Sequence, residues 1–341
     1  MYPVVLPDLA VPLAPLTTLR LGGPARRFVE AESADDVVEA LREPALVIGG
    51  GSNLVIADAG WPGTVVRISS RGRRVERRPD SSVLLTVEAG EEWDDVVAAT
   101  VADGLGGLEC LSGIPGRTGA VPVQNVGAYG VEIAESLVDV DLLVDGAVRR
   151  VPAAELGLAY RTSVLKGCSD AVVLRVRFAL PGDACSAPIR YAELARALGV
   201  APGERVPAAV AREAVLALRR GKGMVLDPAD HDTWSAGSFF TNPILGPAEA
   251  ASLPDDAPRF PADDDRVKTS AAWLIERSGF SRGFGTPGPA TLSTKHTLAL
   301  TNRGEAKAED LLALARQVRD GVRSSFGVEL EPEPVLVGVT L

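Results

Sequence analysis

The feature that most restricts this chain is an 18-residue segment, 113–130, which contains five glycines and two prolines. Glycine weakens regular structure and proline lacks a backbone donor, so neither a helix nor a long strand suits this segment. A connection of this length without secondary structure is uncommon inside a compact domain and is usually functional. A surface loop would carry more charge, whereas here only Arg117 is charged. The segment therefore predicts a binding loop whose backbone can approach a flat ligand closely.

A second glycine-rich segment, Gly-Gly-Gly-Ser-Asn at 49–53, directly follows an expected strand at 45–48. Glycines allow backbone N–H groups to come close to a phosphate. A Rossmann turn would lead into a helix and a P-loop would end in Gly-Lys-Ser/Thr, but residues 54–57 indicate another short strand. Both motifs are excluded. The residues alone leave a phosphate-binding turn and an ordinary tight turn as alternatives.

Composition narrows the classes of partner. The formal net charge is −10, with 45 acidic and 35 basic residues, which argues against binding to nucleic acid or an anionic membrane but not to a small phosphorylated ligand. The three cysteines, Cys110, Cys168 and Cys185, have no metal-type spacing and indicate no disulfide framework. Residues 1–7 do not resemble a signal peptide, and no run approaches the roughly 20 apolar residues that span a bilayer. We expect a cytoplasmic protein without a metal site.

Local patterns predict an α+β chain rather than a regular βαβ alternation. Its 341 residues suit two domains, and Pro181-Gly182-Asp183 is a plausible break between them. Residues 246–265, rich in Pro, Ala and Asp, are expected to form a surface loop. Expected helices lie at 33–41, 92–103, 206–220, 265–278 and 305–326, and expected strands at 45–48, 54–57, 64–68, 83–87, 137–144 and 171–180.

The chain resembles a known enzyme family. Gly-Gly-Gly-Ser-Asn, followed by Ile-Pro-Gly-x-x-Gly-x-x-Pro-x-Gln-Asn-x-Gly-Ala-Tyr-Gly at 114–130, is similar to the UDP-N-acetylenolpyruvoylglucosamine reductases. Further matches follow in order: Tyr160-Arg161-x-Ser163, Gly237-Ser238-Phe239-Phe240-x-Asn242-Pro243, Ala272–Glu276 and Leu330–Glu333. The resemblance extends from about Thr18 to Gly338. The chain departs from the family pattern at Thr17, where many members carry Asn, and at Leu165, which replaces a Phe.

The resemblance implies an FAD-binding domain of the vanillyl-alcohol-oxidase-like (PCMH-type) class at 1–182, built of two α/β subdomains. An α+β substrate-binding domain would follow at 183–341, with its last strand segment returning toward the flavin site. Some members of that superfamily attach the flavin covalently through a histidine. Here the only histidines, His231 and His296, lie outside the expected flavin domain, so noncovalent FAD is expected. The implied cofactor contacts are Gly49, Gly50, Gly51, Ser52 and Asn53 for the pyrophosphate, and Ile114, Pro115, Gly116, Gln124, Asn125 and Gly127 for the remainder.

The resemblance also implies a reaction. With NADPH as reductant, hydride from the flavin N5 would reduce the enolpyruvyl ether of UDP-N-acetylglucosamine enolpyruvate to UDP-N-acetylmuramate in peptidoglycan precursor synthesis. Ser238 would donate the proton, Arg161 would hold the substrate carboxylate and its developing charge, and Glu333 would be the carboxylate partner. Without the resemblance, each residue also suits a purely structural role. Ser238 could be a strand-edge or capping serine, Arg161 a surface arginine, and Glu333 part of a stiff edge segment flanked by prolines.

Four residues would contact the sugar nucleotide: Tyr129, Tyr191, Lys222 and Asn242. Tyr191 matches the tyrosine of a mobile loop that closes over the diphosphate in a loop-bearing subtype. Lys222 lies just past the expected helix at 206–220, where the helix dipole favours a cation, and matches a diphosphate ligand. Without the resemblance, an interface aromatic and a helix-capping lysine are equally good interpretations of Tyr191 and Lys222. The family further suggests a monomer.

Two other functions are compatible with parts of the chain. A different flavin oxidase or dehydrogenase would share the segments at 49–53 and 114–130, but is not expected to carry Ser238, Arg161 and Glu333 in these contexts. A nucleotide-sugar-binding protein without catalysis would bind its ligand and show no reducible flavin. The three candidate catalytic residues favour the reductase.

Overall fold

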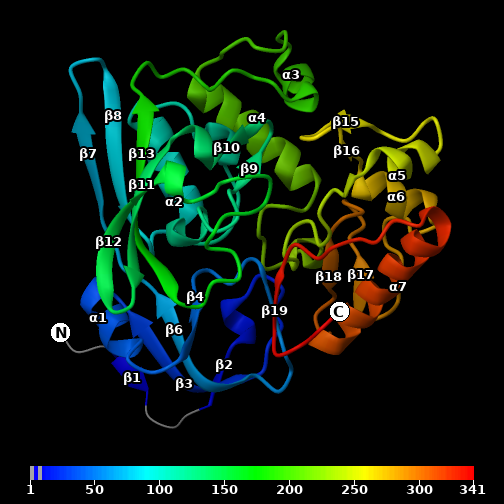
Figure 1. Ribbon diagram of the computed structural model, residues 1–341, viewed down its shortest axis with the longest axis horizontal. Coiled ribbons are helices and arrows are strands. Elements are labelled where there is room, and N and C mark those ends of the chain that lie inside the picture. Colours follow the sequence, from blue (N-terminus) through cyan, green and yellow to red (C-terminus); the bar gives the residue numbers. More distant parts are fainter. Residues whose placement is uncertain (1–3, 7–9) are drawn as a thin grey trace. The chain divides into compact units, whose positions relative to one another are not determined.

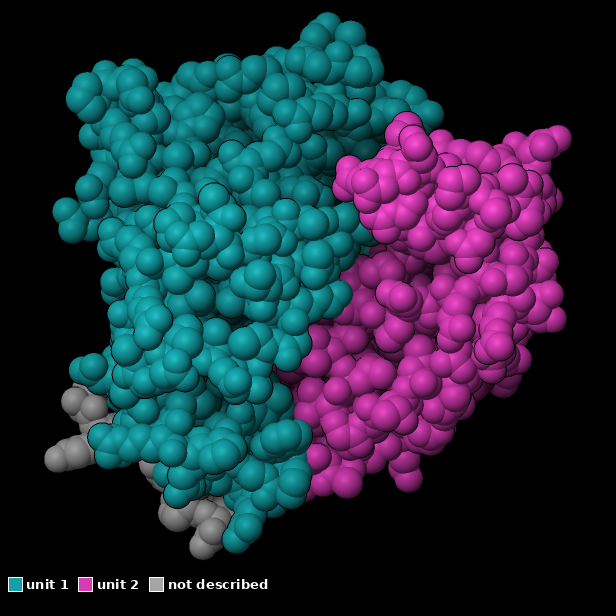
Figure 2. Space-filling view, viewed as in Figure 1, with its two compact units in different colours: residues 1–11, 25–51, 61–225 teal, residues 12–24, 52–60, 226–341 magenta. Residues whose placement is uncertain are grey.

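The computed structural model describes residues 4–6 and 10–341, whose helices and strands are drawn in Figure 1. Residues 1–3 and 7–9, on which the expectation about a signal peptide partly rests, lie outside the described residues. The chain divides into two compact units, each made of separate stretches of sequence (Figure 2). Unit 1 comprises residues 1–11, 25–51 and 61–225, and unit 2 comprises residues 12–24, 52–60 and 226–341.

Unit 1 contains a mixed sheet and an antiparallel sheet. In the mixed sheet, β3 and β4 both run parallel to β6, whereas β1 is antiparallel to β3 and β2 also pairs with β3. A capping box at Ser33 begins helix α1, because Ser33 accepts from the Asp36 N–H and Asp36 accepts from the Ser33 N–H. The elements are β1 (Val4–Leu6), β2 (Val11–Pro12), β3 (Pro24–Ala31), α1 (Ala34–Ala40), β4 (Ala45–Ile48) and β6 (Trp61–Ile68).

The antiparallel sheet of unit 1 has the strand order β12-β11-β13-β8-β7. Along β8, Val83, Leu85 and Val87 are buried and alternate with partly exposed residues, as expected for a strand with one face on the core. Trp93 at the start of α2 is fully buried, with its ring 5.8 Å from that of Phe178 on β13. The elements are β7 (Arg73–Arg77), β8 (Ser82–Glu88), α2 (Trp93–Ala102), β11 (Leu137–Val144), β12 (Ala147–Pro152), β13 (Ala171–Pro181), α3 (Ala192–Leu198) and α4 (Ala208–Gly221).

Unit 2 packs short strand pairs against helices around its own apolar core. The long helix α7 buries Leu311, Ala315, Val318 and Val322 along one face, at helical spacing. The parallel pair β5–β19 brings the C-terminal strand beside residues that directly follow Asn53. The elements are β5 (Leu54–Ile56), β14 (Ile244–Leu245), α5 (Pro247–Ser252), β15 (Phe260–Pro261), β16 (Val267–Lys268), α6 (Ala271–Arg277), β17 (Ala290–Leu292), β18 (Leu300–Asn302), α7 (Ala308–Phe326) and β19 (Val335–Val337).

Short elements complete the described chain. The single-turn 3-10 helices are η1 (Ala14–Leu16), η2 (Glu109–Leu111), η3 (Thr118–Ala120), η4 (Ile133–Glu135), η5 (Ala153–Glu155) and η6 (His231–Thr233). A two-residue hairpin pairs β9 (Gly127–Ala128) with β10 (Val131–Glu132). Within the described residues, no helix combines the length and the apolar character needed to cross a membrane.

The structure confirms the α+β class and most predicted elements, but two predictions in unit 2 were wrong. The helix expected at 265–278 begins only after Ser270, whose hydroxyl accepts from the Trp273 N–H, because Val267 and Lys268 pair with β14 and β15 instead. The stretch expected to be a loop, 246–265, contains α5 and β15. Pro247 at the first helical position and Glu249 at the third stabilise α5 locally.

The division into units also differs from the boundary expected at 182/183. Residues 183–225 belong to unit 1, because Ala211 and Val215 of α4 join its core. The Ala187 N–H donates to the buried carboxylate of Glu109 at 2.6 Å, which ties the start of this stretch to the same unit. Compact units need not coincide with domains, so the domain bounds 1–182 and 183–341 remain a prediction of the resemblance.

Candidate active site

The two predicted cofactor segments meet in unit 1. A Cβ atom on Gly50 would lie 2.7 Å from the Cα of Gly116, closer than real contacts allow, so no side chain fits at Gly50. The Gly116 carbonyl accepts from the Trp93 N–H at 2.9 Å, which anchors this part of the loop to α2. Gly49 and Gly50 therefore pack directly against the loop at Gly116 and Arg117, and we call this close backbone packing the backbone cradle.

Arg117, the only charged residue of the loop, is an internal anchor of that cradle. Its side chain is 4% exposed, donates to the Gly90 carbonyl and pairs with Glu92, with Nε 3.1 Å from Oε1. Burial lowers the pKa of Arg117, although Glu92 opposes this shift. The charge therefore serves to hold the loop against its own unit.

The second half of the loop is shaped by Asn125. This buried side chain donates to Glu132 at 2.7 Å and to the Ala159 carbonyl at 3.1 Å, and its Oδ1 accepts from the Ala134 N–H at 3.2 Å. These bonds hold Asn125 at a positive φ of 45° and lead the chain into the β9–β10 hairpin. Gln124 and Gly127, its predicted cofactor-binding neighbours, are partly exposed on either side. Cofactor contacts at all three residues remain predictions.

Arg161, which follows later in the sequence, is bonded to this same loop. Its NH2 donates to the Gly127 carbonyl at 2.7 Å, and its NH1 is 4.0 Å from Glu132 Oε1. A Cβ atom on Gly127 would stand 3.1 Å from Arg161 NH1, so the absence of a side chain at Gly127 makes room for the guanidinium. Lys166 donates to the Arg161 carbonyl at 3.0 Å and steadies its backbone, which has a φ of 53°. The guanidinium is thus positioned from both its tip and its backbone.

Three of the four predicted substrate residues come together in unit 1. Tyr191 is the N-cap residue of α3, and its ring meets that of Tyr129 edge-on at 5.5 Å. Lys222 follows α4 as its C-cap, with Nζ 5.8 Å from the Tyr129 ring centroid. Glu193, which the sequence analysis did not single out, holds the same Nζ at 2.5 Å. Burial raises the pKa of Tyr129 to about 12, so its hydroxyl stays protonated.

The segment that follows Ser238 pairs with the segment of Glu333 in unit 2. The Glu333 N–H donates to the Phe239 carbonyl at 2.8 Å, and Phe240 bridges Pro332 in antiparallel fashion. Phe239 also donates to the Leu298 carbonyl at 2.8 Å, so Ser238 immediately precedes a residue bonded on two sides. Gly237 supplies the preceding bend at a φ of 74°.

Asn53 attaches the glycine-rich motif to the Glu333 segment. Its Nδ2 donates to the Glu333 carbonyl at 3.2 Å, and its own carbonyl accepts from the Val335 N–H at 2.9 Å. Thr18 donates to the Ser235 carbonyl at 2.7 Å and also contacts the Ser52 carbonyl at 3.4 Å. The motif at 49–53 therefore crosses from unit 1, at Gly51, to unit 2, at Ser52.

Asn242 has a structural partner in unit 2. Its Oδ1 accepts from the Ala271 N–H at 2.9 Å, at the beginning of α6. The resemblance implies that the same side chain contacts the sugar nucleotide. That contact remains a prediction.

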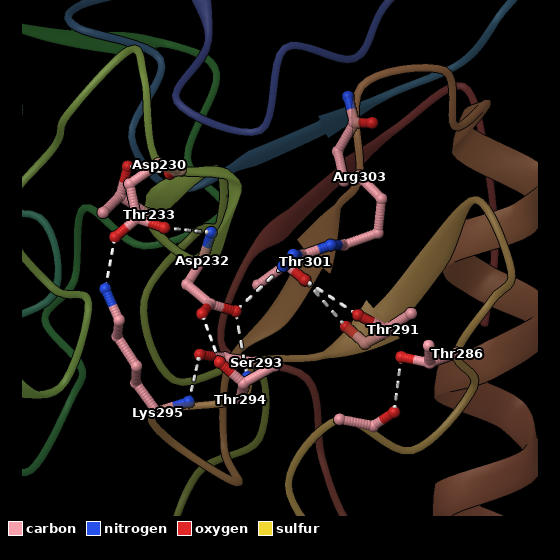
Figure 3. Close-up of polar contacts among 12 residues, drawn as sticks. Asp230, Asp232, Thr233, Thr286, Thr291, Ser293, Thr294, Lys295, Thr301 and Arg303 are labelled. Carbon is pink, nitrogen blue, oxygen red and sulfur yellow. Dashed lines mark hydrogen bonds and ion pairs between the residues drawn. The ribbon is translucent and has the colours of Figure 1, made fainter.

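A polar network in unit 2 is built around Asp230 and Asp232 (Figure 3). Asp232 on η6 accepts from the Thr294 N–H at 2.9 Å, from the Thr294 hydroxyl at 2.5 Å and from Arg303 at 2.8 Å. Burial acts to raise the pKa of Asp232, but these hydrogen bonds and the Arg303 charge outweigh it and hold the pKa below its usual range. Asp230 pairs with Lys295 beside it. The network joins Asp230 and Asp232 to the β17–β18 connection and to Arg303, which follows β18.

Sequence reasoning missed Asp232, Glu132 and Arg219. Arg219 on α4 is 8% exposed, donates to the Met224 carbonyl at 2.9 Å and lies against Gly113, the first residue of the glycine-rich loop. Burial lowers the pKa of Arg219. A signal existed for this residue, since it lies three positions before Lys222 and so on the same side of the helix. Asp232 and Glu132 gave no comparable local signal.

Comparison with known proteins identifies both parts of the chain. Residues 25–151 match the model of an FAD binding domain, and residues 227–337 match that of the UDP-N-acetylenolpyruvoylglucosamine reductase C-terminal domain. The chain is 63% identical to the UDP-N-acetylenolpyruvoylglucosamine reductase of Saccharopolyspora erythraea, over 96% of this chain and 95% of the relative. It is 56% identical to that of Streptomyces avermitilis, over 97% and 94%.

A solved structure agrees as well. The crystal structure of UDP-N-acetylenolpyruvylglucosamine reductase from Thermus caldophilus matches with a TM-score of 0.70 and 28% identity, over 98% of this chain and all of that one. Sequence and structural comparisons therefore point to the same family across nearly the whole chain. The chain belongs to the UDP-N-acetylenolpyruvoylglucosamine reductase family and is an FAD-dependent oxidoreductase of peptidoglycan precursor synthesis.

Proposed function

We propose that this chain reduces the enolpyruvyl ether of UDP-N-acetylglucosamine enolpyruvate to UDP-N-acetylmuramate, with NADPH as the reductant. The observation that carries the proposal is the pairing of the Phe239 carbonyl with the Glu333 N–H at 2.8 Å. It joins the segment of a neutral hydroxyl, Ser238, to that of a carboxylate, Glu333. Protonation of a carbon next to a carboxylate needs a positioned proton donor and a group that interacts with that carboxylate, the roles proposed for these two residues.

The backbone cradle of unit 1 fits FAD. Gly50 cannot carry a side chain, and backbone N–H groups in such turns attract phosphate. Gly49 to Asn53 would hold the pyrophosphate, and residues 114–116, Gln124, Asn125 and Gly127 would line the remainder. FAD, when bound, would supply the hydride from N5 to the terminal carbon of the enolpyruvyl group, with NADPH as the source of its two electrons.

Arg161 would bind the substrate carboxylate. As hydride arrives, negative charge spreads onto that carboxylate, and a guanidinium is always charged and can contact both oxygens. Its attraction therefore grows toward the transition state, as rate acceleration requires. The bond from Arg161 to the Gly127 carbonyl supports this role, because it fixes the guanidinium on the loop that would hold the cofactor.

Ser238 would donate the proton and Glu333 would polarise the substrate carboxylate together with Arg161. A neutral hydroxyl can lie against a developing enolate without the desolvation cost of an ionised acid. Pro332 and Pro334 restrict the backbone on both sides of Glu333, which suits a group that must be held in position. We propose that Glu333 is protonated or hydrogen-bonded when it acts, so a pH–rate profile unchanged in Glu333→Gln would count against this role.

The sugar nucleotide would lie against Tyr129, Tyr191, Lys222 and Asn242. Lys222 offers a charge for the diphosphate, and the Tyr129–Tyr191 contact offers aromatic surface beside it. Membership of the loop-bearing subtype, through Tyr191, belongs to this proposal. So do a monomeric state and a cytoplasmic location.

One experiment tests the whole scheme. The visible absorption spectrum of the purified protein is recorded, then again after anaerobic NADPH, and again after the enolpyruvyl sugar nucleotide. A flavin spectrum that bleaches with NADPH and returns with substrate is expected. Bleaching without return would reject the substrate, and a protein that takes up no FAD would reject the cofactor site.

A further inference from the structure

We propose that Glu193 sets the affinity and the charge selectivity of the diphosphate site, by occupying Lys222 until a ligand of higher charge displaces it. The inference rests on the proposed role of Lys222 and deepens it. It assigns a function to an acidic residue that the reaction itself does not use.

Glu193 lies on a segment whose ends are held firmly in unit 1. We call residues 183–207 the lid segment. Cys185 and Pro207 form an antiparallel β-bridge that joins the two ends of the segment, which we call its base. Arg205 forms an ion pair with Asp183 at 2.7 Å. The Glu109 carboxylate, fully buried, accepts from the Ala187 N–H at 2.6 Å. The base is therefore fixed, and the contacts of Tyr191 and Glu193 hold the rest of the segment against the proposed ligand-binding residues.

Those contacts engage the residues that would receive the ligand. Glu193 Oε2 is 2.5 Å from Lys222 Nζ, and the same Nζ lies 5.8 Å from the Tyr129 ring. Two residues before Glu193, the Tyr191 ring packs edge-on against Tyr129. The carboxylate of Glu193 thus holds the position on Lys222 that an anionic ligand would take.

The ion pair is suited to exchange rather than to permanent support. The Lys222 and Glu193 side chains are 29% and 31% exposed, and pairs with this access to water contribute little to stability. Lys222 also follows the C-terminus of α4, where the helix dipole favours its charge without Glu193. A diphosphate carries more charge than one carboxylate, so it competes well for Lys222. A neutral nucleoside gains nothing from this exchange.

The test measures the binding of two probes, UDP and uridine, to the FAD-loaded protein by isothermal titration calorimetry. Glu193→Gln removes the competing charge while keeping the side-chain shape. We expect the Kd for UDP to fall about threefold to tenfold and the Kd for uridine to stay unchanged. Glu204→Gln is the matched control, because it removes the same charge from the lid segment and makes no ion pair with the described part of the chain. It should leave both Kd values unchanged.

A second comparison locates the effect. In a Lys222→Met background, Glu193→Gln should no longer change the Kd for UDP, since the two residues act through one contact. An unchanged or higher Kd for UDP in the single Glu193→Gln variant would overturn the proposal, as would equal tightening of uridine. So would a wild-type protein that binds no UDP.

The fate of the inference is separable from that of the reductase scheme. If NADPH bleaching and substrate-dependent recovery occur but Glu193→Gln binds UDP like the wild type, the reaction stands and the role of Glu193 falls. If Glu193→Gln tightens UDP selectively while the flavin cycle fails, the role of Glu193 stands and the reaction falls.

Discussion

The candidate site residues of unit 1 and those of unit 2 are held by different physical means. Unit 1 offers mainly backbone: Gly50 and Gly116 approach so closely that no side chain fits, and Arg161 is attached through a glycine carbonyl. Unit 2 offers side chains, Ser238 and Glu333, on segments joined by long-range hydrogen bonds. A bound cofactor needs close approach over a large surface, whereas proton transfer needs single groups at fixed points. The difference predicts that changes in the two units will impair different steps.

The largest effect is expected at Ser238. Ser238→Ala removes the proposed proton donor, so substrate-dependent flavin reoxidation should slow by about 10²–10⁴-fold while reduction by NADPH keeps its rate. Stopped-flow absorbance of the two half-reactions measures this. Ser252→Ala, on α5 of the same unit, is the control. Equal slowing of both half-reactions would mean that unit 2 acts on the cofactor and would end the contrast.

Arg161 is expected to give the next largest effect. Arg161→Met removes the charge that meets the developing carboxylate charge, so reoxidation by substrate should fall by about 10²–10³-fold, with FAD still bound. Arg150→Met changes an exposed arginine of the same unit and should retain full activity. Loss of FAD from the Arg161 variant would instead make this residue part of the cofactor cradle.

Gly50 tests the backbone cradle directly. Gly50→Ala brings a methyl group within 2.7 Å of the Gly116 Cα, and the separation that follows should weaken FAD binding by about tenfold or more. Fluorescence titration of the apoprotein with FAD measures the change. Gly221→Ala, which adds a methyl group to open space on helix α4, should leave FAD affinity intact. Wild-type affinity in the Gly50 variant would remove the cradle from the cofactor site.

Asp232 is expected to give the smallest effect, on stability rather than chemistry. Asp232→Asn weakens the bonds to Thr294 and Arg303, so the free energy of unfolding should fall by about 1–3 kcal/mol at neutral pH. The folded pKa of Asp232 is depressed, so its contribution is present above the ordinary value near 3.8 and is lost as the pH falls through the folded pKa.

Urea denaturation of wild type and variant at pH 7 and near pH 3 measures this difference. The gap between the two proteins should be clear at pH 7 and narrow in acid. Asp263→Asn, at an exposed position of unit 2, should match the wild type at both values. A gap that widens in acid would contradict the assigned direction of the pKa shift.

Elements with local signals were predicted well. Ser33 and Asp36 form the capping box expected from their spacing, and Gly104 and Gly327 follow α2 and α7 with positive φ. The failures arose where a distant partner decided the structure. Residues 267–268 have helix-compatible neighbours on either side, yet they pair with β14 and β15. Asp232 accepts a hydrogen bond from Thr294, 62 residues away, and no local sequence pattern near Asp232 predicts that partner.

The sequence by itself determined the family and the glycine-rich segments of the site. A requirement for glycine or proline depends on the conformation of the residue's own backbone, so it can be recognised from the local sequence. Rare combinations of such residues identify a family. The tertiary structure alone decided which groups hold one another: Asn53 on the Glu333 carbonyl, Arg161 on Gly127, and Glu193 on Lys222. These contacts join segments remote in sequence, and their energies arise only when the packed chain brings donor and acceptor within hydrogen-bonding distance.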